Sequence, residues 1–249
     1  MNTPSVIRIA TLFAAVVLTT APSGVRAGAL PTPPNLADAG WTLMTFPGRP
    51  ATRFTGGGDD AIEVVAESSA ALLYTEVTGA DRRKPVLTWR WRVDETLPAT
   101  DLTRRGGDDR PLAVHICFPA AQRETGLWAR LGGMVRDLAG GLPDGKVLTY
   151  VWGGAQQRGA RFANPYLAED GAMIVLRPGE SATGTWYEER IDFRADFERV
   201  FGYPPPAPDF IAVSGDSDDT MGRSSGRIAG LTFRDRDIGF GPLDGKRGR

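Results

Sequence analysis

The sequence contains very few of the residues from which disulfides and common zinc sites are built: one cysteine and one histidine among 249 residues. One cysteine cannot form an intramolecular disulfide, and a zinc site of the Cys/His kind needs several such ligands. Cys117 lies in the apolar run 114–118, which favours a small buried residue over a reactive thiol. We therefore expect core packing, and not cross-links, to stabilise the fold.

The sequence also lacks a strong net charge and a long apolar run. A formal charge of −1 argues against a nucleic-acid partner, because such a partner requires a basic face. The apolar stretch at residues 9–18 is about half as long as a membrane-spanning helix, and no later stretch approaches that length. We therefore expect a protein that is not embedded in a membrane.

The N-terminus has the order of a secretory signal peptide. Arg8 precedes the apolar stretch 9–18, and a small-residue motif follows at 25–27. We expect cleavage after residue 27 and a mature protein in the periplasm or outside the cell. Removing residues 1–27 takes away Arg8 and Arg26 and no acidic residue, so the formal charge changes from −1 to −3.

Short runs typical of β-strands fill the chain from Trp41 onward, separated by clusters of glycine, proline and aspartate. They lie at 61–66, 70–77, 85–93, 112–118, 146–152, 172–176, 185–191, 210–213 and 227–233. Many short strands with turn signals favour a sandwich or jelly roll over a βαβ layout. We predict a mainly β fold, a single jelly-roll-like antiparallel β-sandwich over 41–237. An extended leader precedes it at 28–40, and a flexible tail follows at 238–249.

Two segments have helical periodicity instead. Apolar residues recur at helical spacing across 124–139, and across 193–201 Phe193 and Phe197 fall on one side. Gly202 then ends the second segment. We expect one or two short helices that cover the sandwich.

Two familiar catalytic or nucleotide-binding motifs occur only in part. Residues 140–146 have the two glycines and the lysine of a phosphate-binding loop, but Val147 replaces the required Ser or Thr. Residues 222–226 match G-x-S-x-G, but the only histidine, His115, precedes the serine, whereas it comes last in enzymes that use this turn. Neither motif predicts an activity.

Alternation along the strand at 85–93 separates two kinds of side chain. Trp89 and Trp91 share one face with aliphatic residues, so we expect both in the core. Arg90 and Arg92 share the other face, where their guanidinium groups lie about 7 Å apart along the strand. They could hold an anionic ligand or pair internally with carboxylates.

The internal partners available to these arginines are Asp108, Asp109 and the loop at Asp216. His115 lies opposite the large apolar residues of its own strand and is the only side chain that normally titrates near neutral pH. If its strand pairs near the arginine strand, His115 joins the same polar face, with Trp152 as an exposed aromatic nearby. The two arginines could therefore either hold a ligand or form a purely structural network with these aspartates.

Three carboxylates, those of Asp216, Asp218 and Asp219, stand in one loop directly after an apolar strand. Oxygen ligands at this density suit calcium. The loop is not a calcium hand, because Arg227 stands where the bidentate acid is needed. A calcium site and a solvated or arginine-paired turn are the two alternatives.

Several segments stand out together in one order: 85–93, Gly-Asp-Asp at 107–109, Tyr-Val-Trp-Gly at 150–153, 196–202 and 215–220. In this order they resemble a bacterial exported family catalogued as domain of unknown function 3047, from Trp41 to Phe233. The resemblance implies fold and compartment and no activity. The closing order of elements is also similar to galactose-binding-type carbohydrate modules. Those modules often bind calcium partly through an acid in the last strand, where Gly230 stands here.

We therefore expect a non-catalytic domain that binds an envelope or extracellular saccharide, or another polar polymer. The predicted ligand-binding residues are Arg90, Arg92, His115, Asp108, Asp109 and Trp152. A polysaccharide-cleaving enzyme and a structural envelope protein are the alternatives. Glycosidases need two carboxylates about 5 or 7–9 Å apart, and the adjacent Glu188 and Glu189 point to opposite faces of a strand. A catalytic pair from different loops stays open, as does the oligomeric state.

Overall fold

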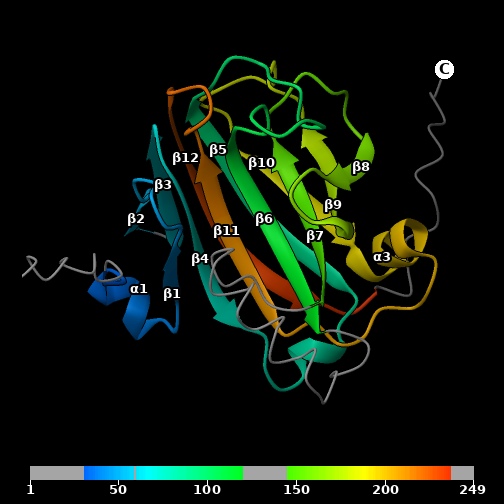
Figure 1. Cartoon of the computed structure of the whole chain (residues 1–249). Helices are drawn as coiled ribbons and strands as arrows, with labels where there is room; N and C mark the ends of the chain where they lie inside the picture. The colour runs from blue at the N-terminus through cyan, green and yellow to red at the C-terminus, as the bar shows by residue number, and fades with distance from the viewer. Residues whose placement is uncertain (1–30, 59, 120–144, 237–249) are drawn as a thin grey trace, which may run out of the picture.

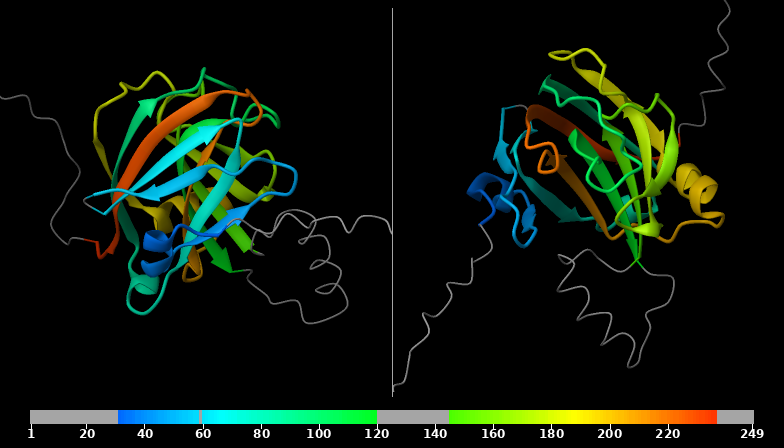
Figure 2. Two further views of the ribbon diagram at one scale, coloured as in Figure 1. Left: turned by 90° about the vertical axis from the view of Figure 1, so that its left-hand side faces the viewer. Right: turned by 45° about the horizontal axis from the view of Figure 1, so that its top comes forward.

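The computed structural model describes residues 31–58, 60–119 and 145–236. These residues form two β-sheets packed face to face, with two short α-helices at the edges (Figures 1 and 2). The larger sheet contains β1 (Thr42–Thr45), β4 (Ala70–Glu76), β11 (Phe210–Asp216), β6 (Arg110–Pro119), β7 (Gly145–Trp152), β9 (Ala168–Arg177) and β8 (Arg161–Asn164), in that spatial order. The smaller sheet contains β10 (Tyr187–Asp192), β5 (Val86–Glu95), β12 (Arg223–Arg234), β3 (Ala61–Glu67) and β2 (Arg53–Gly56). The jelly-roll-like sandwich predicted from the sequence is confirmed.

Every strand expected from the sequence is present, within a few residues at its ends. The short strands β1, β2 and β8 were not predicted. One pairing also differs from the expected antiparallel order, because β7 and β9 run parallel. The chain reverses through β8, which pairs antiparallel with β9 at the edge, and β9 then lies between β8 and β7.

Large aromatic side chains fill the space between the sheets. Trp89 and Trp91 are buried, as expected, with ring centroids 5.4 Å apart. Trp152 is 0% exposed, and its ring lies 5.6 Å from that of Trp91 and 5.3 Å from that of Tyr187. The prediction of Trp152 as an exposed ligand-binding aromatic is therefore wrong, because its side of β7 faces the opposite sheet. Edge-to-face pairs of this kind each contribute about 0.5–1.5 kcal/mol beyond area burial.

Helix α3 (Phe193–Phe201) closes one end of the sandwich (Figure 1). The Asp192 side chain accepts a hydrogen bond from the Ala195 amide, and Gly202 ends the helix with a φ of 81°. Phe193 and Phe197 are buried as predicted, and they contact the aromatic rings of Phe118 in one sheet and Phe233 in the other.

The N-terminal part differs from the expected extended leader. Residues Pro34–Asp38 form helix α1, whose Leu36 packs into the core. Proline at the first helical positions explains this start, since it lacks only an amide hydrogen that would have no partner there. The predicted signal peptide at 1–27, the helix at 124–139 and the tail at 238–249 lie outside the described residues. Within the described residues, no helix is long and apolar enough to cross a membrane.

Candidate functional site

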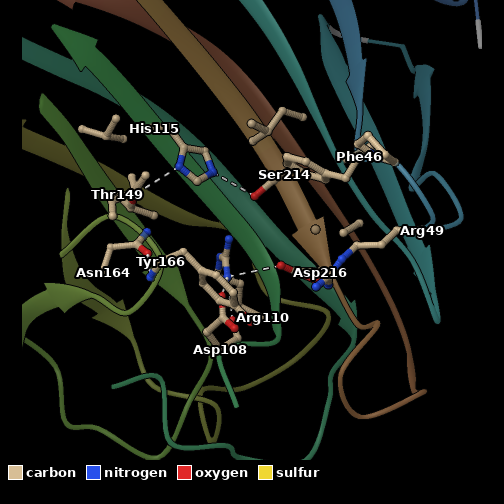
Figure 3. Close-up of a pocket in the computed structure, with 17 residues that line it drawn as sticks. Phe46, Arg49, Asp108, Arg110, His115, Thr149, Asn164, Tyr166, Ser214 and Asp216 are labelled. Atoms are coloured by element: carbon tan, nitrogen blue, oxygen red, sulfur yellow. Dashed lines mark hydrogen bonds and ion pairs between the residues drawn. The ribbon is translucent and has the colours of Figure 1, made fainter. Parts of the chain in front are cut away.

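A cavity of about 310 Å³ lies on the outer face of the larger sheet. Its floor is formed by side chains of β4, β11, β6 and β7, and its walls by the segment after β1 and the segment between β8 and β9. Figure 3 shows His115 at its base, with Phe46 and Arg49 on one side and Asn164 and Tyr166 on the other. The cavity thus brings together parts of the chain that are far apart in sequence.

A row of three uncharged polar side chains crosses the floor. Thr149 lies directly opposite His115 in the β6–β7 register, and its hydroxyl oxygen is 3.1 Å from His115 Nδ1. Ser214 of β11 places its hydroxyl oxygen 2.9 Å from His115 Nε2. All three residues are buried and line the cavity. The row runs across three neighbouring strands and offers hydroxyl and imidazole groups to a ligand.

The imidazole of His115 is uncharged at neutral pH and is a weak base. Burial lowers its pKa to about 3, and the positive charge of Arg110 acts in the same direction. Ser214 and His115 are within the distance of a nucleophile and its base. However, the group on the other ring nitrogen is the Thr149 hydroxyl and not a carboxylate. The row is therefore suited to hydrogen bonding and not to serine nucleophile chemistry.

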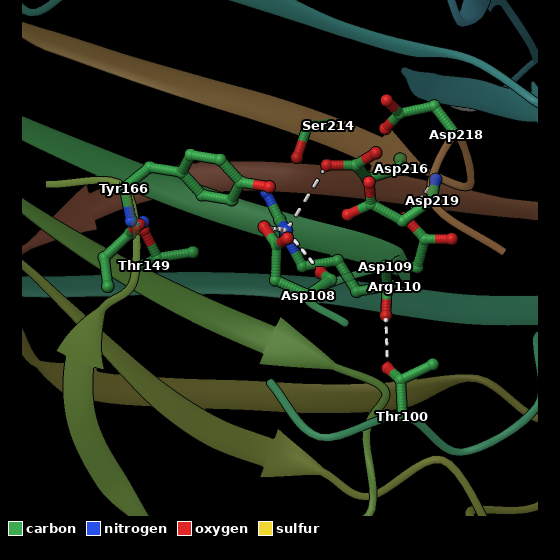
Figure 4. A network of polar contacts seen from close by, with 12 residues as sticks. Thr100, Asp108, Asp109, Arg110, Thr149, Tyr166, Ser214, Asp216, Asp218 and Asp219 are labelled. Atoms are coloured by element: carbon green, nitrogen blue, oxygen red, sulfur yellow. Dashed lines mark hydrogen bonds and ion pairs between the residues drawn. The ribbon is translucent and has the colours of Figure 1, made fainter. Parts of the chain in front are cut away.

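A charged group closes one end of the cavity (Figures 3 and 4). Arg110, the first residue of β6, donates through Nη1 to the backbone oxygen of Asp108 at 2.6 Å and to its Oδ2 at 3.0 Å. The same Nη1 lies 3.4 Å from Oδ2 of Asp216. The Arg110 side chain is only 8% exposed, so this is a buried arginine held between two carboxylates.

Part of this charged group has no hydrogen-bond partner in the described part of the chain. The unpartnered atoms are Nε of Arg110, a donor, and Oδ1 of Asp216, an acceptor. Burial raises the pKa of Asp216 to about 7, against the opposing effect of Arg110; the nearby carboxylates of Asp108, Asp109 and Asp219 raise it further. Near neutral pH, Asp216 therefore exists in both protonated and ionised forms.

Gly215 makes the approach of Asp216 to Arg110 possible. The register between β11 and β6 shifts between Ser214 and Asp216, which is how a bulge redirects a side chain. A Cβ at Gly215 would lie 2.9 Å from the backbone oxygen of Pro111 and 2.9 Å from Cγ1 of Val64. Only glycine fits at this position without a shift of the neighbouring backbone.

Asp109 does not contact Arg110 as Asp108 does, but binds the loop that follows β11. It is 1% exposed and accepts hydrogen bonds from the backbone amides of Asp219 and Thr220 at 3.2 and 2.7 Å, and from the Thr220 hydroxyl at 2.5 Å. It therefore fixes the loop after β11, and it does not line the cavity. Of the two aspartates predicted to bind a ligand, only Asp108 reaches the cavity.

The predicted calcium set is not assembled as expected. Carboxylate oxygens of Asp109, Asp218 and Asp219 lie within 4.8 Å of one another, a spacing that could hold a cation. Asp216 is not part of this group, because it turns toward Arg110. Asp218 forms an ion pair with Arg49, which supports the arginine-paired alternative for this loop.

The predicted arginine face lies elsewhere. Arg90 and Arg92 point outward from the smaller sheet, where their guanidinium carbons lie 5.0 and 5.5 Å from the ring centroid of Trp186. Arg92 also pairs with Asp94 at 2.7 Å. Because β5 and β6 belong to different sheets, these arginines and His115 face opposite sides of the sandwich. The expectation that they share one polar face is wrong.

Sequence reasoning missed Arg110 and the aromatic walls. Arg110 directly follows the Asp108-Asp109 pair and begins the strand that carries His115, a signal that could have identified it. Tyr166 is 43% exposed, and Arg105 lies over its ring at 5.3 Å. Tyr166 follows Asn164 and Pro165, a pair typical of turns, so the sequence does not distinguish it from an ordinary turn residue.

A second cavity, of about 520 Å³, lies between β8, β9 and α3. Three cations line it, and each lies close to a carboxylate: Lys146 to Asp170 at 2.7 Å, and both Arg161 and Arg199 to Asp196 at 3.9 and 2.8 Å. Each of these cations is thus paired within the protein, and none of the three has an unpartnered buried atom such as Nε of Arg110 in the first cavity.

A family model described as "Protein of unknown function (DUF3047)" matches residues 39–232. No curated protein sequence matches the chain.

Solved structures with a similar arrangement include glycan-degrading enzymes. A meso-active thermostable cellulase derived from Cel12A of Rhodothermus marinus shares 12% identity, covering 79% of this chain and 92% of that one, with a TM-score of 0.42. The xyloglucanase domain of NopAA from Sinorhizobium fredii, in complex with cellobiose, shares 10% identity, with 78% and 93% covered and a TM-score of 0.37. Endoglucanase 3 of Trichoderma harzianum, from family GH12, shares 10%, with 78% and 99% covered and a TM-score of 0.31.

Proposed function

The chain belongs to this family of unknown function, DUF3047, and we propose that it binds a saccharide in the cavity on the outer face of the larger sheet. One observation carries the proposal: the cavity is lined by a buried arginine and a partly buried aspartate, and each has a polar atom without a hydrogen-bond partner among the described residues, Nε of Arg110 and Oδ1 of Asp216. The first atom is a hydrogen-bond donor and the second an acceptor, the two kinds of partner that the hydroxyl groups of a saccharide need. Buried polar groups of this kind otherwise cost free energy.

The rest of the lining supports the same ligand class. The uncharged row of Thr149, His115 and Ser214 offers hydrogen bonds without fixed charge, which suits a neutral or weakly acidic polyol. Phe46 and Tyr166 add aromatic surface to the walls, against which the C–H face of a sugar ring can pack. Ligand sites are commonly about 300–1,000 Å³, so a cavity near the lower limit accepts one or two sugar units.

The ligand belongs outside the cytoplasm under this proposal, because we also propose that residues 1–27 are a secretory signal. The exposed Tyr166 stands at the mouth of the cavity. A longer polymer can therefore leave one or two units in the cavity while the rest of its chain stays in solvent.

Isothermal titration calorimetry of the purified protein against neutral, uronic-acid and amino-sugar oligosaccharides tests the proposal. We expect binding of at least one class and a loss of about tenfold in affinity for Ser214→Ala and for Tyr166→Ala, since one hydrogen bond or stacking contact contributes about 1–1.5 kcal/mol. Arg90→Ala, on the opposite face, is the matched control and should bind like the wild type. Absence of binding to every class, or an equal loss in Arg90→Ala, would overturn the proposal.

A further inference from the structure

The imidazole of His115 limits how the polar row on the cavity floor can be hydrogen-bonded. Burial lowers the pKa of His115 to about 3, so its ring is neutral at pH 7. A neutral imidazole has one N–H donor and one acceptor nitrogen. Its two nitrogens face two hydroxyl oxygens, that of Thr149 at 3.1 Å and that of Ser214 at 2.9 Å. One hydroxyl must therefore donate to the ring, and the other must accept from it.

The burial of Thr149 decides which hydroxyl donates. Thr149 is 0% exposed, and within the described part of the chain its hydroxyl has a hydrogen bond only with Nδ1 of His115. If Thr149 accepted that bond, its own proton would be buried without an acceptor, which costs free energy. Thr149 therefore donates to Nδ1, and the ring proton is on Nε2. The Nε2–H group then donates to the oxygen of Ser214.

Ser214 is left with a proton to donate. Its oxygen accepts from His115, and its proton has no acceptor among the described residues. Because Ser214 lines the cavity, a ligand can supply that acceptor. The bond from His115 also polarises the Ser214 hydroxyl and strengthens it as a donor. The floor thus favours a ligand with a strong acceptor, such as a carbonyl oxygen.

Asn164 offers a second donor to the same cavity (Figure 3). Its Oδ1 accepts a hydrogen bond from the Tyr166 amide at 2.9 Å, which fixes the orientation of the carboxamide. Its NH2 group is therefore free to donate, and it is not among the fully enclosed polar atoms that lack a partner in the described residues. Ser214 and Asn164 both present donors, so the bound group should be an acceptor.

The charges around the cavity disfavour an anion as that acceptor. Arg110 already lies near the carboxylates of Asp108 and Asp216. Arg49 pairs with Asp218. A ligand carboxylate would have to compete with these side chains for the same two cations, and it would be repelled by them. An uncharged carbonyl oxygen avoids both costs.

An apolar side chain stands next to Ser214. Leu72 lies opposite Ser214 in the β11–β4 register and also lines the cavity. An acetyl group has a carbonyl oxygen and a methyl group on one carbon, so it can bond Ser214 while its methyl contacts Leu72. We propose, as an extension that rests on the proposed saccharide binding, that the cavity binds the N-acetyl group of an amino sugar, with Ser214 donating to its carbonyl oxygen.

The position of the ring proton can be measured directly, because His115 is the only histidine of the chain. Long-range proton–nitrogen NMR correlation, on protein with isotope-labelled histidine and no added histidine tag, shows which ring nitrogen carries the proton. We expect it on Nε2 at pH 7. Thr149→Val removes the buried hydroxyl, so the Nε2–H fraction should fall in that variant. A proton on Nδ1 in the wild type would overturn the inference.

The ligand test compares sugars that differ in one substituent. The probes are matched gluco and galacto oligosaccharides in which the same carbon carries a hydroxyl, an amino or an N-acetyl group, together with uronic-acid oligosaccharides. In calorimetric titrations we expect the N-acetyl form to bind about tenfold more tightly than the hydroxyl form, the effect of one hydrogen bond. Ser214→Ala should reduce this preference to less than about threefold. Ser225→Ala, the same change on β12 of the smaller sheet, should retain it.

The outcomes separate this inference from the proposed function. Equal affinity for the hydroxyl and N-acetyl forms, or tightest binding of the uronic acid, would overturn the N-acetyl assignment and leave saccharide binding standing. A preference unchanged in Ser214→Ala would overturn the role of Ser214. Absence of binding to every probe would overturn both. The wild-type NMR spectrum and the wild-type selectivity need no variant, so they decide the matter even if a variant fails to fold.

Discussion

The two outer faces of the sandwich use the same kinds of residue in opposite ways. On the larger sheet, Arg110 is 8% exposed and lies between Asp108 and Asp216 at the end of a cavity. On the smaller sheet, Arg92 pairs with Asp94 across 2.7 Å with side-chain exposures of 23% and 32%. One ion pair is enclosed by protein, and the other is shared with solvent.

This difference in burial determines what each charge contributes. Water screens an exposed ion pair, so such pairs contribute about 0–1 kcal/mol. A buried charge without its partner is far more costly, because no solvent replaces the lost interaction. On the outer face of the larger sheet, a bound ligand, a gained proton or a substitution should therefore change the free energy of unfolding strongly. On the outer face of the smaller sheet, where the charges are solvated, the same changes should have small effects.

The largest expected effect separates the two arginines. Arg110→Met should lower the free energy of unfolding by about 3–5 kcal/mol at pH 8, because it leaves the buried Asp108 and the partly buried Asp216 without their cation. Arg92→Met should cost less than about 1 kcal/mol. Urea denaturation of both variants gives the comparison. At pH 5 the Arg110→Met loss should shrink, since Asp216, with a pKa of about 7, is then protonated. Equal losses in the two variants would remove the distinction between the faces.

The next largest effect concerns how stability depends on pH, because two residues of the cavity, His115 and Asp216, should change it in opposite directions. The pKa of His115 falls from 6.5 to about 3 on folding, so its contribution to stability is present above pH 6.5 and is lost as the pH falls toward 3. The pKa of Asp216 rises from 3.8 to about 7, so its contribution is present below pH 3.8 and is lost as the pH rises toward 7.

Relative to wild type, His115→Gln should therefore gain stability as the pH falls from 6.5 to 4, by at most about 1.4 kcal/mol per pH unit. Asp216→Asn should gain stability as the pH rises over the same range, by a similar amount. Arg92→Met should show a nearly constant difference. Chemical denaturation at half-unit pH intervals measures these slopes, and slopes of the same sign for the two cavity variants would contradict the assigned pKa directions.

The smallest effect concerns a pair on the open face. Arg227 and Glu63 lie opposite one another in the β12–β3 register, with Nε and Oε1 2.8 Å apart and both side chains 38% exposed. A double-mutant cycle with Arg227→Met and Glu63→Gln should give a coupling of about 0.2–1 kcal/mol. Half-molar salt should largely remove it. A coupling above about 2 kcal/mol would show that this face is not as solvated as its exposure indicates.

Much of the fold could be predicted from alternation alone. The apolar period along β5 and β6 indicated which residues face the core, and Trp89, Trp91 and Phe118 are indeed buried. The strands that escaped prediction, β1, β2 and β8, are only four residues long. So short a stretch contains two residues per face, which is too few to reveal a period.

The site was harder to predict because alternation does not indicate to which sheet a strand belongs. Strands β5 and β6 follow one another in the sequence but lie in different sheets. Arg90 and His115 therefore face opposite sides of the sandwich. The acidic segments at Asp108 and Asp216 were recognised as candidates, but their partner, Arg110, was not. Packing over the whole chain determines which sheet a strand joins, so this cannot be predicted from the sequence of that strand alone.

The place of β11 between β4 and β6 has a consequence for how the protein folds. The middle of the cavity floor comes from the second-last strand of the described residues, β11, while its neighbours β4 and β6 come from the first half of the sequence. Contacts so distant in sequence form late and slowly, on a scale of about milliseconds to seconds in all-β domains. The cavity is therefore among the last features completed. During refolding, the recovery of ligand binding should lag behind early burial of tryptophan and report arrival at the native state.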